Sequence, residues 1–391
     1  MAEIIDPIVI NDNDPSPTES TLLHPYPGSM PAFLASRLIE RYSNSGDMIF
    51  DPFCGSGVVL VESIKQGRNA TGMDLLEIPL FIAKTATSMP NASDIRDCWM
   101  RVKHAALNDV SIFSSLKSPG LPGVCVQELS NWFHAETLAE ILAIRNHVGL
   151  SSKSKSEVVI ALVLGGALLS LSKRVSRGVL HWGWIADNVL PGKLDLYVVN
   201  VFQEMDWRIN RLVSFMDATG TEDLISRNTC IIKRVDWTSE RESEIEVCDL
   251  LLTSPPYPYS IDYTLALRLS HYLYGIDFNE MRASEIGARY KRKRKARRDD
   301  YLFEIRKALH GASKAVRDDG LAAFVLPHPD DYPAALNLSE GEWMNYINDS
   351  LSGSWQVEEF GVRDCLQRRV VHSTLANRRE LVLVCRKSNS K

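Results

Sequence analysis

The sequence predicts an α/β domain with a mostly parallel sheet, interrupted by a helical insertion. Short apolar runs that end in a polar residue alternate with stretches of helical spacing, which is typical of strands and helices in turn. Between about residues 78 and 228 the apolar spacing is helical and convincing strand signals are lacking. We therefore expect a flexible lead-in at 1–20, an α/β domain formed by 21–77 and 229–391, and a mostly helical insertion at 78–228.

The first elements are predicted as helix, strand, glycine-rich turn and helix. Residues 31–42 carry apolar side chains at helical spacing, and Pro31 suits a first turn. The run MIFDPF is a short strand ending near Asp51, CGSG is a turn, and VVLVESIKQG is a helix that closes on Gly67. A second strand, within NATGMDLLE, ends at Asp74.

Four more strands are expected after the insertion. Two of them, CIIKRVD at 230–236 and EVCDLLLTS at 246–254, again finish in a polar residue. A helix, YLFEIRKALHGASKAV, and a turn, RDDG, lead to the last two strands, LAAFVLP and ELVLVCR. Strands that alternate with helices in this way favour a largely parallel sheet.

Composition narrows the class of protein. The chain has 391 residues, of which 45% are hydrophobic and 24% are charged, as is ordinary for a soluble globular protein. Its seven cysteines form no CxxC pair and no cluster with histidine, so we expect no metal site, no disulfide framework and a cytoplasmic setting. The longest apolar run, Val158 to Ser172, is shorter than the roughly 20 residues that span a bilayer, which predicts a buried helix and no membrane contact.

The loop DPFCGSG stands where α/β sheets bind ligands, after a strand and before a helix. Gly55 and Gly57 let the backbone approach a ligand closely, and Asp74, about twenty residues on, has the position of an acid that accepts from ribose hydroxyls. Asp236 is a candidate acceptor for an adenine amine. The loop lacks GxGxxG and GK[ST], so a nucleoside without phosphates fits best; the alternative is a plain turn with packing glycines.

The stretch TSPPYPYS follows an apolar run directly. One Pro-Pro pair is expected by chance in a chain of this length, so only its position is informative. Ser254 lies at the carboxyl end of a predicted strand, and two fixed φ angles hold the turn that presents Tyr257. Tyr259 is as well suited to core packing as to a ligand contact.

The segments DPFCGSG and SPPY, with HPYPGSMP at 24–31 ahead of them, resemble the motifs of DNA amino-methyltransferases that use S-adenosylmethionine. The resemblance spans most of the chain from His24 to the final strand, although specific residues match only at these segments. It implies a Rossmann-like methyltransferase domain, with the helical insertion as a possible target-recognition region. The cofactor-binding residues would then be Tyr26, Gly28, Asp51, Pro52, Phe53, Gly55, Gly57, Asp74 and Asp236.

The same resemblance implies catalytic residues Ser254, Pro255, Pro256 and Tyr257. The Ser254 hydroxyl and the Pro255 carbonyl would hold an exocyclic amine in the transition state, and Tyr257 would stack on a flipped base of double-stranded DNA. Serine at the first position favours N4 of cytosine. The alternatives are N6 of adenine, the guanine amine of tRNA, and a DNA-binding protein without activity. Methylation of carbon 5 would need a Pro-Cys pair, which is absent, so Cys54 is expected to be a packing residue.

Positive charge is concentrated in RYKRKRKARR at 289–298, although the formal net charge of the chain is −5. Such a run is often a solvated loop, but beside a base-flipping site it would bind phosphates. The predicted nucleic-acid contacts are Arg289, Lys291, Arg292, Lys293, Arg294, Lys295, Arg297 and Arg298. A cognate restriction endonuclease is a possible partner.

Overall fold

The computed structural model describes residues 3–4, 17–113, 120–172, 198–220, 228–239, 245–293, 296–365 and 378–389. Their strands form a mixed sheet in the order β1-β7-β8-β6-β5-β2-β3-β4. The strands are β1 Glu3–Ile4, β2 Met48–Asp51, β3 Asn69–Asp74, β4 Cys230–Arg234, β5 Cys248–Thr253, β6 Val316–Pro327, β7 Trp355–Cys365 and β8 Arg378–Lys387. Strand β8 is antiparallel to β6 and β7, and the other pairs are parallel, which confirms the predicted α/β fold with a mostly parallel sheet.

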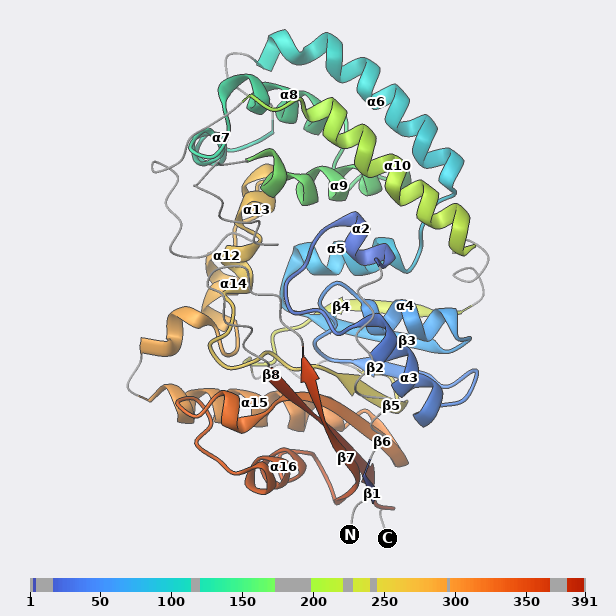
Figure 1. Ribbon diagram of the computed structural model, residues 1–391, viewed down its shortest axis with the longest axis vertical. Helices are drawn as coiled ribbons and strands as arrows, with labels where there is room; N and C mark the ends of the chain where they lie inside the picture. The colour runs from blue at the N-terminus through green and yellow to red at the C-terminus, as the bar shows by residue number, and fades with distance from the viewer. Residues whose placement is uncertain are drawn as a thin grey trace.

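Helices cover both faces of the sheet and gather in a second group above it (Figure 1). Those of the N-terminal part are α2 Glu19–Leu23, α3 Ala32–Tyr42, α4 Val58–Lys65 and α5 Glu77–Ala86. The upper group is α6 Ala92–Phe113, α7 Gly123–Ser130, α8 Ala135–Arg145, α9 Lys155–Leu171 and α10 Val201–Thr219. After β5 follow α12 Tyr263–Ala266, α13 Arg268–Tyr274, α14 Asn279–Ser284, η2 Arg289–Lys293, α15 Arg297–Ser313, η3 Pro329–Asp331 and α16 Glu340–Asn348.

The central strands are apolar along their length because both of their faces are covered. In β2, Ile49 packs into the core beneath α3 and α4, while Phe50 packs into the core beneath α15 and α16. Leu250 and Leu251 of β5 alternate in the same way and lie directly beside them in register. A parallel sheet that is buried on two sides produces such continuous hydrophobic runs.

The order of the strands reverses between β2 and β5. From β2 the chain continues through α4 to β3 on one side, whereas β5 pairs with β2 on the other side. In open α/β sheets the ligand binds in the crevice at the carboxyl ends of the strands where the order reverses. This topology therefore brings the turn after β2 and the turn after β5 to one place, although about 200 residues separate them.

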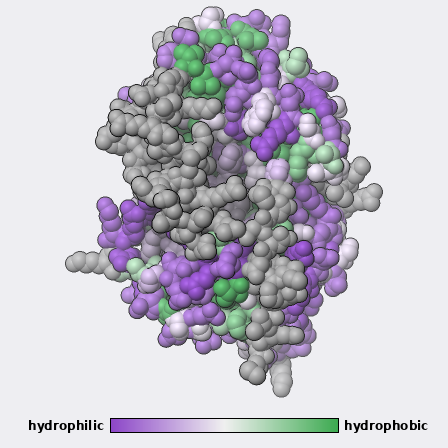
Figure 2. Space-filling model, viewed as in Figure 1, coloured by the Kyte–Doolittle hydropathy of each residue, from purple (hydrophilic) through white to green (hydrophobic). Residues whose placement is uncertain are grey.

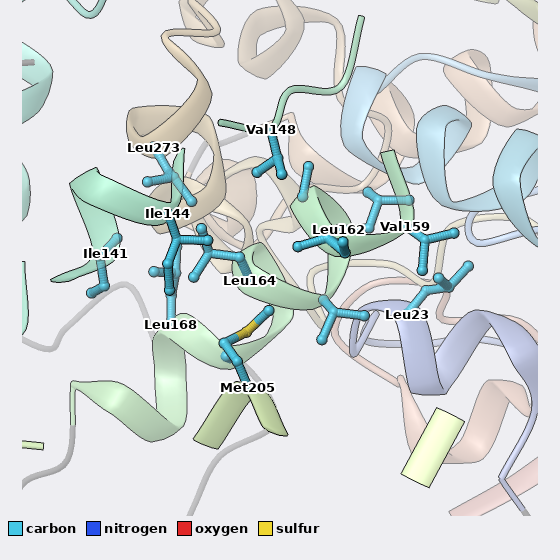
Figure 3. Packing of buried hydrophobic residues seen from close by; sticks show 14 of the residues in the cluster. Leu23, Ile141, Ile144, Val148, Val159, Leu162, Leu164, Leu168, Met205 and Leu273 are labelled. Atoms are coloured by element: carbon cyan, nitrogen blue, oxygen red, sulfur yellow. The ribbon is translucent and has the colours of Figure 1, made fainter. Parts of the chain in front are cut away.

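The upper helices surround α9, which is buried nearly all round. Side chains from α2, α8, α10 and α13 converge on it (Figure 3). At Gly166 an added Cβ would lie 2.9 Å from the Cα of His24, so the pair Gly165–Gly166 lets the segment that follows α2 pass directly against α9. Between β3 and β4 the described residues form helices only, and the first of these, α5, packs on β3 and β4.

None of the described helices has the length and apolar character needed to cross a membrane. The face shown in Figure 2 is largely hydrophilic where it is described, with hydrophobic residues in separate groups. The predicted buried helix at 158–172 is confirmed as most of α9.

Three sequence expectations need correction. The lead-in at 1–20 is structured at Glu3–Ile4, which pair with β7 and so cover an edge that would otherwise expose unpaired backbone groups. The turn RDDG lies within the bounds of β6, where the register slips between Cys248 and Leu250 of β5 and Asp319 has a φ of 60°. Strand β7 was not predicted. Its residues alternate only weakly between buried and exposed positions, so its sequence carries no clear strand pattern.

Replacing Gly166 by alanine should destabilise the fold by about 1–3 kcal/mol, since the new methyl group overlaps His24, Pro25 and the Leu23 carbonyl. Helix propensity alone predicts the opposite sign, a gain of up to about 1 kcal/mol. Urea unfolding of Gly166→Ala and of Gly341→Ala separates the two effects. Gly341 is also helical, and a methyl group added there would have no atom within 4 Å, so this control should be neutral or stabilising. Equal effects of the two substitutions would contradict the close packing.

Candidate active site

A pocket of about 840 Å³, counted with its open mouth, lies at the carboxyl ends of β2, β3, β4 and β5. Its walls include the turn after β2, the segment after α2 and the residues that follow β4 and β5. Of the predicted cofactor residues, Tyr26, Gly28, Asp51, Phe53, Gly55, Asp74 and Asp236 line it.

Two glycines bring backbone close to a pair of aromatic rings. The rings of Tyr26 and Tyr263 stack with centroids 5.8 Å apart. An added Cβ on Gly55, whose φ is 48°, would lie 2.8 Å from Cε1 of Tyr26, and one on Gly28 would lie 2.9 Å from the hydroxyl of Tyr263. Any side chain at these positions would thus collide with the aromatic wall of the pocket.

Gly57 and Pro52 lie next to the pocket but do not line it. The Gly57 φ is 83°, and an added Cβ would approach Cβ of Ala83 in α5 to 2.7 Å, so this glycine serves helix packing. The Pro52 carbonyl accepts a hydrogen bond of 2.8 Å from Nε1 of Trp237, whose ring lines the pocket. Gly57 thus packs against a helix away from the pocket, whereas Gly55 lies in the pocket lining against Tyr26.

Asp51 joins the turn after β2 to the end of β5. Its Oδ1 accepts from the Thr253 hydroxyl at 2.6 Å and from the Phe53 amide at 3.0 Å. Both Asp51 and Thr253 are buried. Burial raises the pKa of Asp51 to about 7, although its two hydrogen bonds oppose this shift. A carboxylate that is costly to ionise thus lies at the floor of the pocket.

Asp74 is the last residue of β3, and Asp236 lies just after β4. Asp74 accepts from the Gly55 amide and the Leu76 amide, each at 2.9 Å, and burial outweighs these bonds and raises its pKa. For Asp236, burial alone would raise the pKa, but hydrogen bonds led by those from the Thr238 hydroxyl and Ser284 hold it below its usual value. Asp236 therefore stays ionised more readily than Asp74.

The turn SPPY closes one side of the pocket. Ser254 and Pro256 line it, while Pro255 is buried beside them. The Pro256 carbonyl accepts from the Tyr301 hydroxyl at 3.0 Å, which fixes the turn to α15. Tyr257 does not line this pocket; its hydroxyl donates to Oε1 of Glu380 at 2.8 Å, and burial foremost, then Glu380, raises its pKa well above the usual value.

Tyr259 is a structural residue of the same loop. Its φ is 56°, its amide donates to the Gly287 carbonyl at 2.7 Å, and its hydroxyl donates to the Arg297 carbonyl. The ring packs against Tyr301 at a centroid distance of 6.2 Å. Of the two roles left open for Tyr259, the structure assigns core packing.

The charge of the pocket is one-sided. Its described lining contains the carboxylates of Asp51, Asp74, Asp236 and Glu285, and no lysine, arginine or histidine. Sequence reasoning missed Glu285, Tyr263 and Trp237, because none of them has a motif around it: Tyr263 begins the short helix α12, Glu285 follows α14 and Trp237 follows β4. Only their position after β4 and β5 places them at the ligand edge of the sheet.

The predicted phosphate-binding segment divides into buried and exposed parts. Lys291 is 3% exposed and pairs with Glu304 at 2.9 Å, so it is removed from the surface set. Arg297 and Arg298 donate to the carbonyls of Ala334 and Leu336, and Arg289 is half-buried in η2. The exposed described cations are Arg292 and Lys293, while Arg294 and Lys295 lie outside the described residues.

Cys54 lines the pocket but is not suited to nucleophilic attack. It is 5% exposed, and burial foremost, then Asp74 and Asp51, raises its pKa well above the usual value of a thiol. Within the described ranges, no three His, Cys, Asp or Glu side chains are grouped so as to hold a metal ion.

Comparison with known proteins connects the first part of the chain to a family. Residues 9–84 match the family described as DNA methylase. The chain is 39% identical over 62 residues to the type II methyltransferase M.MjaII of Methanocaldococcus jannaschii, which covers 16% of this chain and 12% of that protein. It is 22% identical over 243 residues to the type II methyltransferase M.MvaI of Kocuria varians, which covers 60% of this chain and 52% of that protein.

Among solved structures, TrmN from Thermus thermophilus aligns with 94% of this chain and 51% of its own, at 11% identity and a TM-score of 0.37. The chain spans about half, or less, of the length of the curated relatives it matches. The family match confirms the resemblance of the motif region to DNA amino-methyltransferases and supports S-adenosylmethionine as the cofactor.

The raised pKa of Asp51 predicts a pH-dependent stability. Between its unfolded value near 3.8 and its folded value of about 7, the folded state holds a proton that the unfolded state has lost, so stability falls as pH rises through this window. Asp51→Asn keeps the acceptor oxygen and removes the charge. Relative to wild type, its free energy of unfolding should rise by about 3 kcal/mol between pH 4.5 and 8.5. The exposed Asp97→Asn control should show little change, and a constant difference for Asp51→Asn would refute the assignment.

Proposed function

We propose that this chain, whose residues 9–84 match the DNA methylase family, transfers a methyl group from S-adenosylmethionine to the exocyclic amine of a DNA base. The observation that carries the proposal is the shared pocket. The turn DPFCGSG and the turn SPPY meet at the switch point of the sheet, around a cavity whose described charged lining residues are all acids. We further propose N4 of cytosine as the preferred target.

The described lining fits this cofactor better than a nucleotide. S-adenosylmethionine carries a sulfonium, an ammonium and a carboxylate group, so its net charge is positive, whereas the phosphates of a nucleotide would meet four acidic side chains and no basic residue in the described lining. Asp74 and Asp236 line the pocket and would accept from the ribose hydroxyls and the adenine amine, and Tyr26 faces the glycine turn. When bound, the cofactor supplies a methyl group that a nucleophile can attack.

The residues of SPPY would activate the amine. An exocyclic amine is a weak nucleophile because its lone pair is delocalised into the ring. The Ser254 hydroxyl and the Pro255 carbonyl would accept its two N–H groups and favour a pyramidal nitrogen, an interaction that is strongest in the transition state. The bond from Thr253 to Asp51 and the bond from Tyr301 to Pro256 hold this turn in place, so little reorganisation is needed.

Tyr257 would receive the target base. The Glu380 carboxylate holds the Tyr257 hydroxyl, and Tyr332 packs edge-on against the ring at a centroid distance of 6.2 Å. These two contacts fix the orientation of the half-buried ring, which would stack on the base. The base must leave the duplex to reach it, so we propose double-stranded DNA with a flipped nucleotide as the substrate.

Methyl transfer and base identity are tested in one experiment. Purified protein, duplex DNA and labelled S-adenosylmethionine should yield labelled DNA, and digestion to nucleosides with mass analysis should give N4-methylcytosine. The double variant Ser254→Ala with Pro255→Ala should lower the rate at least about 100-fold, because the acceptors that act in the transition state are lost or displaced. Pro258→Ala with Ser260→Ala changes the same residue types in the same loop and should keep the activity. Normal transfer by the first variant would refute the catalytic assignment. Detection of N6-methyladenine in place of N4-methylcytosine would change the assigned target base from cytosine to adenine.

Phosphate contact by the basic segment is tested through salt dependence. Replacing Arg292, Lys293, Arg294 and Lys295 by glutamine should weaken DNA binding. It should also reduce the magnitude of the slope of log K against log salt by up to about 4, because fewer counterions are released from DNA when fewer phosphates are contacted. Titration by fluorescence anisotropy at several salt concentrations measures both values. Lys291→Met serves as the control: it removes the buried pair with Glu304, so it should alter stability and leave the salt slope unchanged. An unchanged slope in the glutamine variant would exclude this segment as the phosphate site.

A further inference from the structure

Glu285 is a buried acid in the wall of the pocket. It is 4% exposed and follows α14, in the segment that lies across the pocket from the turn after β2. Its Oε1 accepts from the Tyr263 amide, and its Oε2 accepts from the Thr264 hydroxyl at 2.8 Å and the Thr264 amide at 3.3 Å. Three hydrogen bonds leave acceptor capacity on this carboxylate for a further partner.

Negative charge reaches the aromatic wall from two sides. Burial is the main reason that the pKa of Tyr26 is raised. The negative charges of Asp74, at the end of β3, and of Glu285, which follows α14, raise it further. Tyr263, which stacks on Tyr26, has its amide bound by Glu285 itself. A ligand that lies against these two rings is therefore between carboxylates.

Glu285 has no positive counterpart in the pocket. Among the described lining residues none is basic, and the nearby Asp262 is also an acid. Burial foremost raises the pKa of Glu285 to about 7, which is the behaviour of a carboxylate that lacks a cation. A bound cation would supply that charge, whereas a neutral ligand would leave the carboxylate uncompensated.

We propose that the charge of Glu285 makes the pocket discriminate between the sulfonium of S-adenosylmethionine and the neutral thioether of S-adenosylhomocysteine. This inference rests on the proposed function. The two ligands share adenosine, ammonium and carboxylate, and differ only by a methyl group and one positive charge at sulfur. A change in the affinity ratio of the two ligands therefore reports on that charge.

The discrimination would assist turnover. In the reaction the carbon–sulfur bond to the methyl group breaks, its electron pair stays on sulfur, a carbon–nitrogen bond forms, and the amine releases one proton to water. The sulfonium becomes a neutral thioether, so attraction to Glu285 is lost in the step that forms the product. Glu285 would thus favour the substrate form of the cofactor without contacting the transferred methyl group.

A purely structural role makes a different prediction. If Glu285 served only to bind the amides at the start of α12, loss of its bonds would weaken both ligands alike, since they share every group except the sulfonium. Thr264→Val removes one of these hydrogen bonds and keeps the charge, whereas Glu285→Gln removes the charge and keeps an acceptor oxygen. Thr264→Val thus tests the role of Glu285 in holding the backbone, and Glu285→Gln tests the role of its charge.

Isothermal titration of the full chain with each ligand tests the proposal. Glu285→Gln should lower the affinity ratio of S-adenosylmethionine to S-adenosylhomocysteine by about tenfold relative to wild type. Thr264→Val should leave the ratio unchanged, whatever it does to both affinities. An equal ratio in Glu285→Gln and wild type, with methyl transfer by wild type intact, would overturn the inference alone. If wild type binds neither ligand, the proposed function itself fails.

A second measurement applies if Glu285→Gln does not fold. The groups that face Glu285 are Asp262, Tyr26 and Tyr263. Asp51, with a pKa of about 7, and Asp74, whose pKa is raised, are the further pocket acids that titrate above their usual range. In Asp51→Asn the affinity ratio should still rise between pH 6 and pH 8.5, because Glu285 ionises in that range. A ratio that stays flat in Asp51→Asn would overturn the proposal.

Discussion

The hydrogen bond between Thr253 and Asp51 is the contact on which the candidate site depends. Both side chains are buried, and their oxygens lie 2.6 Å apart across neighbouring strands. Asp51 begins the glycine turn and Thr253 directly precedes Ser254, so this bond links the two motifs to each other directly. The topology brings the strands together, but only a side-chain contact fixes how far each turn extends beyond the sheet. Burial makes the charged form of Asp51 unfavourable, but the side chain connects the two motifs from this position.

The upper helices support the pocket through the segment that follows α2. His24 bonds to the Ser270 hydroxyl of α13 at 2.8 Å, and its backbone lies against Gly166 of α9. Two residues later, Tyr26 forms the aromatic wall with Tyr263. The helical part of the chain is thus not an independent attachment: its most buried helix positions the backbone that closes one side of the ligand site.

The elements with local signals were predictable from the sequence. Alternating strands and helices, the glycine turn and the acid of Asp74 each follow from spacing within about 25 residues. Glu285 and Lys291 were not predictable, because their roles depend on contacts with Tyr263 and with Glu304 that only the fold creates. A run of basic residues shows where positive charge is concentrated along the chain, but it does not show which side chain turns inward. Tyr259 illustrates the same limit, since its positive φ and its bond to Arg297 have no sequence signature.

The two halves of the site are held by different parts of the sheet. The cofactor side rests on the parallel strands β2, β3 and β4, whose carboxyl ends carry the acids. The proposed base side is held by the antiparallel strands β7 and β8: Glu380 of β8 accepts from Tyr257 and pairs at 3.3 Å with Arg363 of β7, which is 3% exposed and also stacks near Phe33 of α3. Glu380 provides a negatively charged partner for this buried guanidinium, and its other oxygen accepts from the Tyr257 hydroxyl and so orients the tyrosine. The last strands of the chain therefore determine how the turn after β5 presents its ring, which explains why a motif of four residues needs the whole sheet to act as a site.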